Sequence, residues 1–217
     1  MTMSENSITV THVSKHFKEG TALQDVTVAF EKGKIHGIIG RNGSGKTVLF
    51  KCICGFIPPS AGEIVVGGKR IGKDTDIPDH VGIIIEAPSF LPNYSGYGNL
   101  RLLASINHKI GKEAIRAAIA KVGLDPDSKK HVRKYSMGMR QRLGIAQAIM
   151  EDPEILIFDE PMNGLDHTGV KEIRDILKGL RDEGKTIILS SHNSEDIREL
   201  CDTVCEMDAG ILKVKCG

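Results

Sequence analysis

The sequence has 217 residues, of which 40% are hydrophobic and only 4% aromatic, enough for one large domain with a sizeable core. Lysine and arginine number 29 against 28 aspartates and glutamates, so no overall basic charge indicates a nucleic-acid-binding protein. No apolar run approaches the roughly 18 to 20 residues that a membrane-spanning helix needs. We therefore expect a soluble chain that acts at a membrane only through a partner.

The first predicted elements are two strands near the N-terminus. Residues 8–13 and 26–30 alternate apolar and polar side chains, as strands with one exposed face do. Antiparallel sheets commonly keep one face in water. We therefore expect an antiparallel β region at the N-terminal side of a mixed sheet.

A glycine-rich segment lies between a predicted buried strand, residues 35–39, and a predicted helix, residues 48–54. This segment, GRNGSGKT at residues 40–47, matches the phosphate-binding pattern G-x-x-x-x-G-K-[ST] without a gap. Its glycines let backbone N–H groups surround a polyphosphate. Lys46 would reach the β and γ phosphates, and the Thr47 hydroxyl would bind Mg²⁺. The predicted phosphate-binding residues are Gly40, Asn42, Gly43, Ser44, Gly45, Lys46 and Thr47.

Three later segments, residues 81–85, 155–158 and 186–189, are nearly continuously apolar. This is typical of parallel strands buried on both faces, and the helical patterns between them indicate an α/β fold. Between about residues 97 and 134 the strand pattern gives way to apolar residues at helical spacing. We expect a single domain, residues 1–217, with a helical insert. The nucleotide-binding core would comprise residues 1–86 and 151–217, and the helical subdomain residues 87–150.

Two further candidate sites follow predicted buried strands, where open α/β sheets place their ligands. Asp159 and Glu160 come directly after residues 155–158. Asp159 would hold Mg²⁺ and Glu160 would polarise an attacking water, unless the strand merely ends in a charged loop. His192 follows residues 186–191. A lone histidine is usually structural, but at this position His192 would contact a γ-phosphate or the attacking water.

Taken in order, these motifs resemble the ATP-binding cassette family over essentially the whole chain. The family's most specific element is a short signature, usually LSGGQ, at the start of a helix, and YSMGM at residues 135–139 occupies that place. Ser136 and Gly138 match the signature, whereas Met137 and Met139 depart from it. This variant looks like the one found in drug and bacteriocin exporters of the bacitracin-resistance type.

Other positions match the family residue by residue. PMNGLD at residues 161–166 resembles its D-loop, and His192 stands at its switch histidine. Phe17 stands where the family stacks an aromatic ring on adenine, which is physically sensible because every base offers a π-face. The alternative is ordinary packing of Phe17. The resemblance implies ATP and Mg²⁺ as the bound cofactors.

One departure from the family concerns Glu86, at the end of the predicted strand 81–85. The family normally has a glutamine there that contacts Mg²⁺ and the attacking water. A carboxylate would bind Mg²⁺ more strongly but would repel the γ-phosphate unless the metal or a proton compensates. A glutamate at this place is similar to what is seen in transporters that protect against lantibiotics and related antimicrobial peptides. We therefore expect Glu86 to act on the metal and in catalysis.

The resemblance also implies an ATPase that works as a dimer. In the family, the signature of one subunit binds the γ-phosphate held by the phosphate loop of the other, so Ser136 and Gly138 would act on the second subunit's ATP. Closure on ATP and release after hydrolysis would drive a separate multi-span permease. We expect the second subunit to be another copy of the chain or a related ATPase. The permease would hold both at the cytoplasmic face of the cell membrane.

The leading hypothesis is thus the ATPase subunit of an exporter for antimicrobial peptides or drugs. A competing class comprises family members that move no solute, such as an assembly scaffold, which only the signature variant and Glu86 oppose. A nucleotide sensor without catalysis is opposed by Glu160 and His192. An importer is opposed because the chain lacks the extra C-terminal domain that many importers carry.

Overall fold

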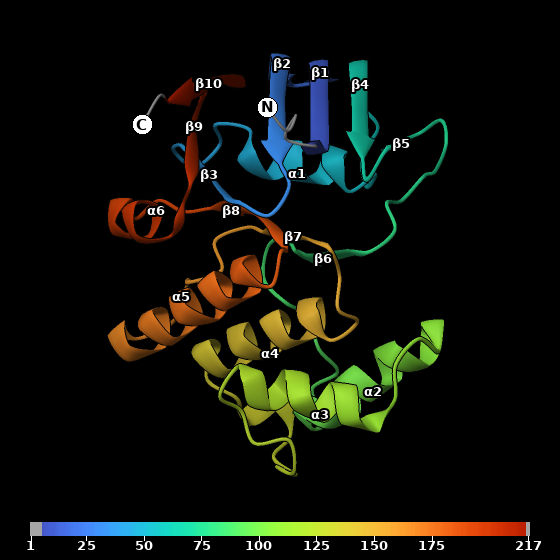
Figure 1. The fold of residues 1–217 in the computed structure, drawn as a ribbon, viewed down its shortest axis with the longest axis vertical. Helices are drawn as coiled ribbons and strands as arrows, with labels where there is room; N and C mark the ends of the chain where they lie inside the picture. Colours follow the sequence, from blue (N-terminus) through green and yellow to red (C-terminus); the bar gives the residue numbers. More distant parts are fainter. Residues whose placement is uncertain (1–5, 216–217) are drawn as a thin grey trace.

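The computed structural model describes residues 6–215, which form two β-sheets and a set of helices (Figure 1). The first sheet has the strand order β2-β1-β4-β5, and all neighbouring strands are antiparallel. Its strands are β1 (Asn6–Phe17), β2 (Gly20–Glu31), β4 (Ala61–Val66) and β5 (Lys69–Arg70). The expected antiparallel region is confirmed, and it forms a sheet of its own.

The second sheet has six strands in the order β10-β9-β3-β8-β7-β6. Its neighbours are parallel except for the pair of β9 and β10, which is antiparallel, so this sheet is mixed. Its strands are β3 (Ile35–Ile39), β6 (Val81–Ile84), β7 (Ile155–Phe158), β8 (Thr186–Ser190), β9 (Thr203–Asp208) and β10 (Ile211–Lys215). The three apolar segments predicted as buried parallel strands are β6, β7 and β8.

The side chains of β7 show how this sheet separates two hydrophobic cores. Successive side chains of a strand point to opposite faces. Ile155 and Ile157 pack in the core shared with α1 and the antiparallel sheet, whereas Leu156 and Phe158 pack in the core shared with the helices on the other side. Both faces of β7 are therefore covered, which explains its uninterrupted apolar sequence.

Helices cover both faces of the second sheet (Figure 1). Helix α1 lies between the two sheets, α4 and α5 lie on the opposite side, and α2 and α3 lie beyond them. The helices are α1 (Lys46–Ile53), α2 (Gly96–Asn107), α3 (Lys112–Lys121), α4 (Met137–Ile149), α5 (His167–Asp182) and α6 (Ser194–Leu200), with the short 3-10 helix η1 (Val132–Lys134). The region between about residues 97 and 134 is helical, as the sequence predicts.

Helix α4 packs closely against the edge strand β6 because of Gly82. A Cβ atom at Gly82 would lie 2.1 Å from the carbonyl oxygen of Ala148, closer than any side chain could tolerate. Glycine thus lets the backbone of α4 approach the strand directly. This contact fixes the helix that begins at the signature segment relative to the sheet.

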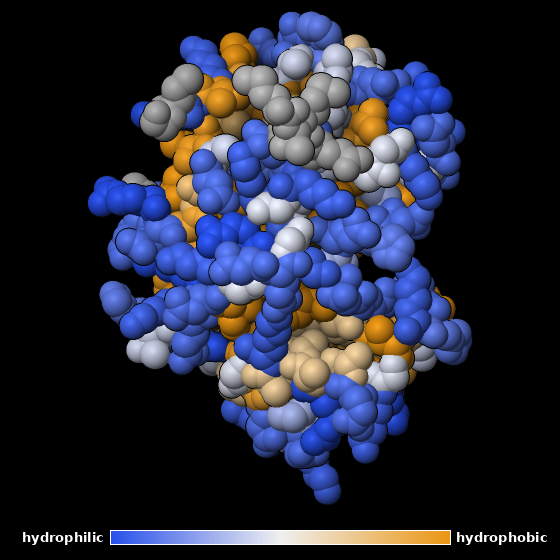
Figure 2. Space-filling view, in the orientation of Figure 1, coloured by the Kyte–Doolittle hydropathy of each residue, from blue (hydrophilic) through white to orange (hydrophobic). Residues whose placement is uncertain are grey.

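The face of the molecule seen in Figure 2 is mainly hydrophilic, with apolar residues gathered at the level of α4. Large apolar side chains that remain exposed include Ile106 on α2 and Met137 at the start of α4. Within residues 6–215, no helix combines the length and the apolar character that crossing a membrane requires.

Candidate nucleotide site

Four loops meet at one edge of the second sheet. Strands β3, β8, β7 and β6 are neighbours and run parallel, so their carboxyl ends lie at the same edge. Residues 40–47 follow β3, Glu86 follows β6, Asp159 and Glu160 follow β7, and His192 follows β8. The topology therefore places the loops that carry these predicted residues side by side.

The loop of residues 40–47 folds around the side chain of Lys46. Lys46 is buried, and its Nζ donates to the carbonyl oxygens of Gly40 (2.7 Å) and Arg41 (3.1 Å). Gly45 has a φ of +113°, and a Cβ atom there would lie 2.7 Å from the carbonyl oxygen of Ala22. Only glycine fits this backbone without strain. The loop thus fixes the charged amine of Lys46, and it brings the backbone at Gly45 close to that of Ala22.

A cavity of about 330 Å³ opens beside this loop. Its lining residues are Ala22, Asn42, Gly43, Ser44, Gly45, Lys46, Thr47, Val48, Asp159 and Glu160. The Oγ of Ser44 is buried and has no hydrogen-bond partner among the described residues. An unpaired buried hydroxyl costs about 1–3 kcal/mol, so its presence indicates a ligand that supplies the partner. A phosphate oxygen held by Lys46 would be such a partner.

Both carboxylate oxygens of Asp159 accept hydrogen bonds from hydroxyl groups. Thr47 Oγ1 donates to Oδ2 at 2.6 Å, and Ser190 Oγ donates to Oδ1 at 2.6 Å. Thr47 is at the start of α1, and Ser190 is the last residue of β8, so three elements are joined at this carboxylate. Asp159 and Ser190 are buried, which strengthens these bonds. A hydroxyl and a carboxylate side by side are oxygen ligands of the kind that Mg²⁺ prefers.

Glu160 and His192 are in direct contact beside this group. Glu160 has a φ of +53°, which residues other than glycine rarely adopt, and its N–H donates to Ser190 Oγ at 2.9 Å. Its carboxylate oxygen Oε2 lies 2.8 Å from His192 Nδ1. Strained backbone of this kind is concentrated at functional sites. A carboxylate at the rim of a cavity, held by a histidine, can accept a proton from a nearby water.

Glu86 is not among the residues that line the cavity. Its φ is +64°, and its Oε1 pairs with Lys51 Nζ of α1 at 2.5 Å. The Glu86 side chain is 64% exposed. Ion pairs in water contribute only about 0–1 kcal/mol, so little free energy opposes their separation. The structure thus brings Glu86 near the end of β7 but engages its carboxylate elsewhere.

Phe17 also lies outside the cavity, at the end of β1. Its side chain is 46% exposed, and Lys15 Nζ lies 5.1 Å from the centre of its ring. The Phe17 ring is therefore not buried in the core, and a lysine side chain lies over it. This environment is compatible with stacking on a base and does not support ordinary core packing.

The signature segment lies away from the cavity and caps α4. Ser136 is the N-cap, and its Oγ accepts the N–H of Met139 at 3.2 Å. Ser136 and Gly138 do not line the cavity formed by the phosphate loop. The signature segment therefore does not contribute to the cavity of its own chain.

The signature helix is attached to the loop that follows Glu160. Gln141 is buried, and its Nε2 donates to the carbonyl oxygen of Pro161 at 3.0 Å. A Cβ atom at Gly164 would lie 2.5 Å from Cγ of Met137, so the methionine lies directly on this glycine. The departure of Met137 from the common signature therefore has a packing partner. The signature and the D-loop-like segment are coupled by direct contact.

A model of the ABC transporter family matches residues 23–163, which include the phosphate loop, the signature segment, Asp159 and Glu160. The chain belongs to the ABC transporter family. It is an ATP-binding cassette, the ATPase component of such transporters. The family assignment agrees with the cavity beside Lys46 and the unpaired hydroxyl of Ser44, which fit a polyphosphate.

Relatives of this cassette include ATP-binding proteins of bacterial transporters. The uncharacterized ABC transporter ATP-binding protein YybJ of Bacillus subtilis is 43% identical, over 95% of this chain and 94% of the relative. The bacitracin transport ATP-binding protein BcrA of Enterococcus faecalis is 39% identical, over 98% of this chain and 70% of BcrA. The lantibiotic transport ATP-binding protein SrtF of Streptococcus pyogenes is 34% identical, over 90% of this chain and 84% of SrtF.

Solved cassette structures share the fold. The dimeric ATP-binding cassette MJ0796, in a post-hydrolysis state bound to ADP and Pi, matches with a TM-score of 0.85 at 21% identity, over 97% of this chain and 99% of that chain. The cassette cbiO1 from Clostridium perfringens, part of the transporter complex cbiONQ, matches with a TM-score of 0.84 at 27% identity, over 96% and 87%. These likenesses establish the fold of the ABC cassette for this chain.

Sequence reasoning missed two residues of this cassette's site. Ser190 contacts both Asp159 and the backbone of Glu160, although the sequence shows only a serine after an apolar strand. Lys51 pairs with Glu86 across 35 positions of sequence. Both contacts depend on how α1, β6, β7 and β8 are arranged in space. The one local signal is a polar residue at the end of a buried strand.

Proposed function

We propose that the chain is the ATPase subunit of an exporter that removes antimicrobial peptides or drugs through a separate membrane permease. ATP hydrolysis is supported by one observation. The hydroxyls of Thr47 and Ser190 bind the carboxylate of Asp159, and Glu160 lies beside them. The proposed substrate class is supported by two relatives that are named for bacitracin and lantibiotic transport. Glu86 supports it further, because it resembles the variant of self-protection transporters.

ATP would bind along the phosphate loop and beside Phe17. Lys46 provides a fixed positive charge, and Ser44 a hydroxyl that lacks a partner among the described residues. The backbone N–H groups at the N-terminal end of α1 attract negative charge. The exposed ring of Phe17 offers a π-face to adenine. The remaining proposed phosphate contacts are Gly40, Asn42, Gly43, Gly45 and Thr47.

The residues present also fit Mg²⁺. Thr47 and Asp159 would hold it through oxygen atoms that lie 2.6 Å apart in the structure. When bound, the metal would neutralise charge that develops on the phosphates during hydrolysis. We propose Glu86 as a further ligand, which requires its carboxylate to leave Lys51.

Glu160 would act as the general base. Its carboxylate accepts the proton of the attacking water, and His192 holds that carboxylate in position through the bond at Nδ1. The backbone of Glu160 is held at its unusual φ by Ser190. These contacts hold the carboxylate at the cavity, which lowers the cost of arranging it during the reaction.

We propose that Ser136 and Gly138 act on the nucleotide of a second subunit, either another copy or a related ATPase. They lie outside the cavity of their own chain, and the hydroxyl of Ser136 is at an exposed helix N-terminus. The helical subdomain, residues 87–150, would pass closure of the core, residues 1–86 and 151–217, to the permease. In this proposal the permease would hold the chain at the cytoplasmic face of the membrane.

Co-purification tests the transport part of the proposal. The chain is tagged in its native host with Glu160→Gln, which keeps the ATP-bound state, and membranes are solubilised gently. A multi-span membrane protein that co-purifies with this variant, and less with Lys46→Ala, is the expected result. A soluble partner without any membrane protein would instead support an assembly scaffold and contradict the exporter.

A further inference from the structure

The last residue of β8 and the two residues that follow it form hydrogen bonds with different partners. Ser190 binds Asp159 and the backbone of Glu160, and His192 binds the Glu160 carboxylate. Ser191 lies between them but points elsewhere, because its Oγ donates to Asp196 Oδ2 of α6 at 2.9 Å. Ser191 is buried, so this bond is shielded from water. Of these three residues, Ser191 therefore binds a partner, Asp196, that does not line the cavity beside the phosphate loop.

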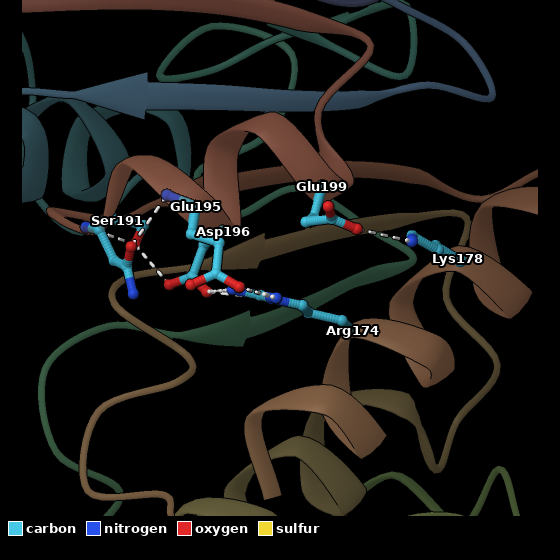
Figure 3. Close-up of polar contacts among 7 residues, drawn as sticks. Arg174, Lys178, Ser191, Glu195, Asp196 and Glu199 are labelled. Atoms are coloured by element: carbon cyan, nitrogen blue, oxygen red, sulfur yellow. Dashed lines mark hydrogen bonds and ion pairs between the residues drawn. The ribbon is translucent and has the colours of Figure 1, made fainter. Parts of the chain in front are cut away.

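Asp196 is a buried carboxylate with both oxygens in use. Its side chain is 4% exposed, and Oδ1 accepts from Nε (3.1 Å) and Nη2 (2.7 Å) of Arg174 on α5. Arg174 also donates to Glu195 at 3.2 Å. Figure 3 shows the guanidinium of Arg174 reaching from α5 to α6, with Ser191 on the other side of Asp196. A buried charge must be paired in this way to be tolerated, so the position of Asp196 is tightly fixed.

His192 itself is not fixed by packing. Its side chain is 66% exposed, and among the described residues its ring forms a hydrogen bond with Glu160. The backbone on either side of it is constrained, because Ser191 Oγ accepts the N–H of Asn193 at 3.1 Å while donating to Asp196. The backbone that carries His192 is therefore anchored to α6 through the hydroxyl of Ser191.

We propose that Asp196, held by Arg174, is a positioning residue that orients His192 toward Glu160 through the hydroxyl of Ser191. This inference rests on the function proposed above, because it requires His192 to act in ATP hydrolysis. Asp196 does not touch the cavity beside the phosphate loop. Its effect on turnover would pass entirely through the placement of His192, which can be tested by removing His192.

The test measures ATP turnover for Asp196→Asn and Ser191→Ala in two backgrounds, the unmodified chain and His192→Ala. In the unmodified chain, each substitution should lower kcat about tenfold with KM within about twofold, the usual size of effects from residues that orient a functional group. In the His192→Ala background, the same substitutions should change kcat by less than about twofold. Ser191→Thr keeps the hydroxyl and should restore most of the turnover.

Lys178→Met is the matched control. Lys178 pairs with Glu199 at 3.7 Å and also joins α5 to α6, but without reaching the loop of Ser191 (Figure 3). This substitution should leave kcat unchanged in both backgrounds. If Lys178→Met lowers kcat as much as Asp196→Asn does, the link between the helices matters only for structure, and the inference is wrong.

A second readout does not depend on turnover. In nucleotide-free protein labelled with ¹⁵N-histidine, the ring signals missing from His192→Ala belong to His192. Ser191→Ala and Asp196→Asn should move these signals, whereas Lys178→Met should not. Should Asp196→Asn fail to fold, Ser191→Ala, which removes one hydroxyl, still provides both readouts.

The outcomes separate this inference from the proposed function. If His192→Ala lowers kcat but Asp196→Asn and Ser191→Ala do not, the inference alone fails. Equal losses in both backgrounds would also contradict it, because Asp196 would then act independently of His192. Full turnover in His192→Ala would remove the role of His192 in the proposed function, and the inference with it.

Discussion

Asp159 and Ser136 are both polar residues of the proposed ATP site, yet their surroundings differ. Asp159 is buried, and hydroxyl groups from α1 and β8 bind both of its carboxylate oxygens. Ser136 is exposed, and within residues 6–215 its hydroxyl accepts the N–H of Met139 in its own helix. The side chains around the phosphate loop thus bind one another within one chain, whereas the hydroxyl of Ser136 in the signature segment lies at the surface. This difference supports the proposal that Ser136 acts on the nucleotide of a second subunit.

The largest effect is expected from Glu160→Gln, which removes the proposed general base beside the phosphate loop. ATP binding should persist because Lys46 and the phosphate loop are untouched. Turnover should fall about 10²- to 10³-fold, the size of a general-base contribution. Light scattering with ATP should show a stable dimer, and the unmodified chain is the control. Unimpaired turnover would remove Glu160 from its assigned role.

Ser136→Asp tests the role of the signature segment without destabilising the helix that the segment begins. Aspartate is as good an N-cap as serine, so α4 should keep its stability. The added negative charge would repel a γ-phosphate from a second subunit. Binding of ATP to the single chain should stay within about twofold, while dimer formation and turnover should fall at least about tenfold. Normal dimerisation of this variant would mean that Ser136 does not face the second subunit's nucleotide.

Ser190→Ala should lower both the free energy of unfolding and the rate of ATP turnover. It leaves one oxygen of Asp159 and the N–H of Glu160 without their partner. Loss of a buried hydrogen-bonding group costs about 1–3 kcal/mol, which denaturant unfolding would measure. Turnover should fall about tenfold, because the carboxylate of Asp159 and the backbone of Glu160 both lose a hydrogen bond. The matched control is Ser105→Ala, whose exposed hydroxyl binds Leu102 within α2, and it should change neither quantity measurably.

The smallest effect is expected from Glu86→Gln. Its ion pair with Lys51 is mostly exposed, so stability should change by less than about 1 kcal/mol. Nucleotide binding should stay largely intact, whereas transport in the complete exporter should change. Tolerance of the host to antimicrobial peptides measures this, with Lys51→Met separating loss of the ion pair from loss of the carboxylate. Unchanged tolerance to every peptide tested would contradict the proposed substrate class.

Elements with a clear local pattern could be predicted from the sequence. The phosphate loop and the strands β3, β7 and β8 follow from local patterns, because buried parallel strands are continuously apolar. Strands β9 and β10 were not predicted, since their mixed sequences resemble exposed segments. The formation of two sheets also depends on strand order, which no local pattern contains.

The roles of Ser190 and Asp196 lay beyond the sequence for the same physical reason. Ser190 and Asp159 are 31 positions apart, and Arg174 and Asp196 are 22 positions apart. These pairs meet only after the sheet and helices have packed. The family resemblance supplied Ser136, Glu86 and Phe17 as site residues, and their roles stay predictions, because the structure places them outside the cavity.

Mixing two inactive chains tests most directly whether the signature segment completes the site of a second subunit. Lys46→Ala damages the phosphate loop, and Ser136→Asp damages the signature. A mixed dimer carries both defects in one site and leaves the other site intact. An equimolar mixture should recover up to about a quarter of normal ATP turnover, because half of randomly formed dimers are mixed and each mixed dimer has one intact site of two. Turnover no higher than the average of the two separate variants would contradict it.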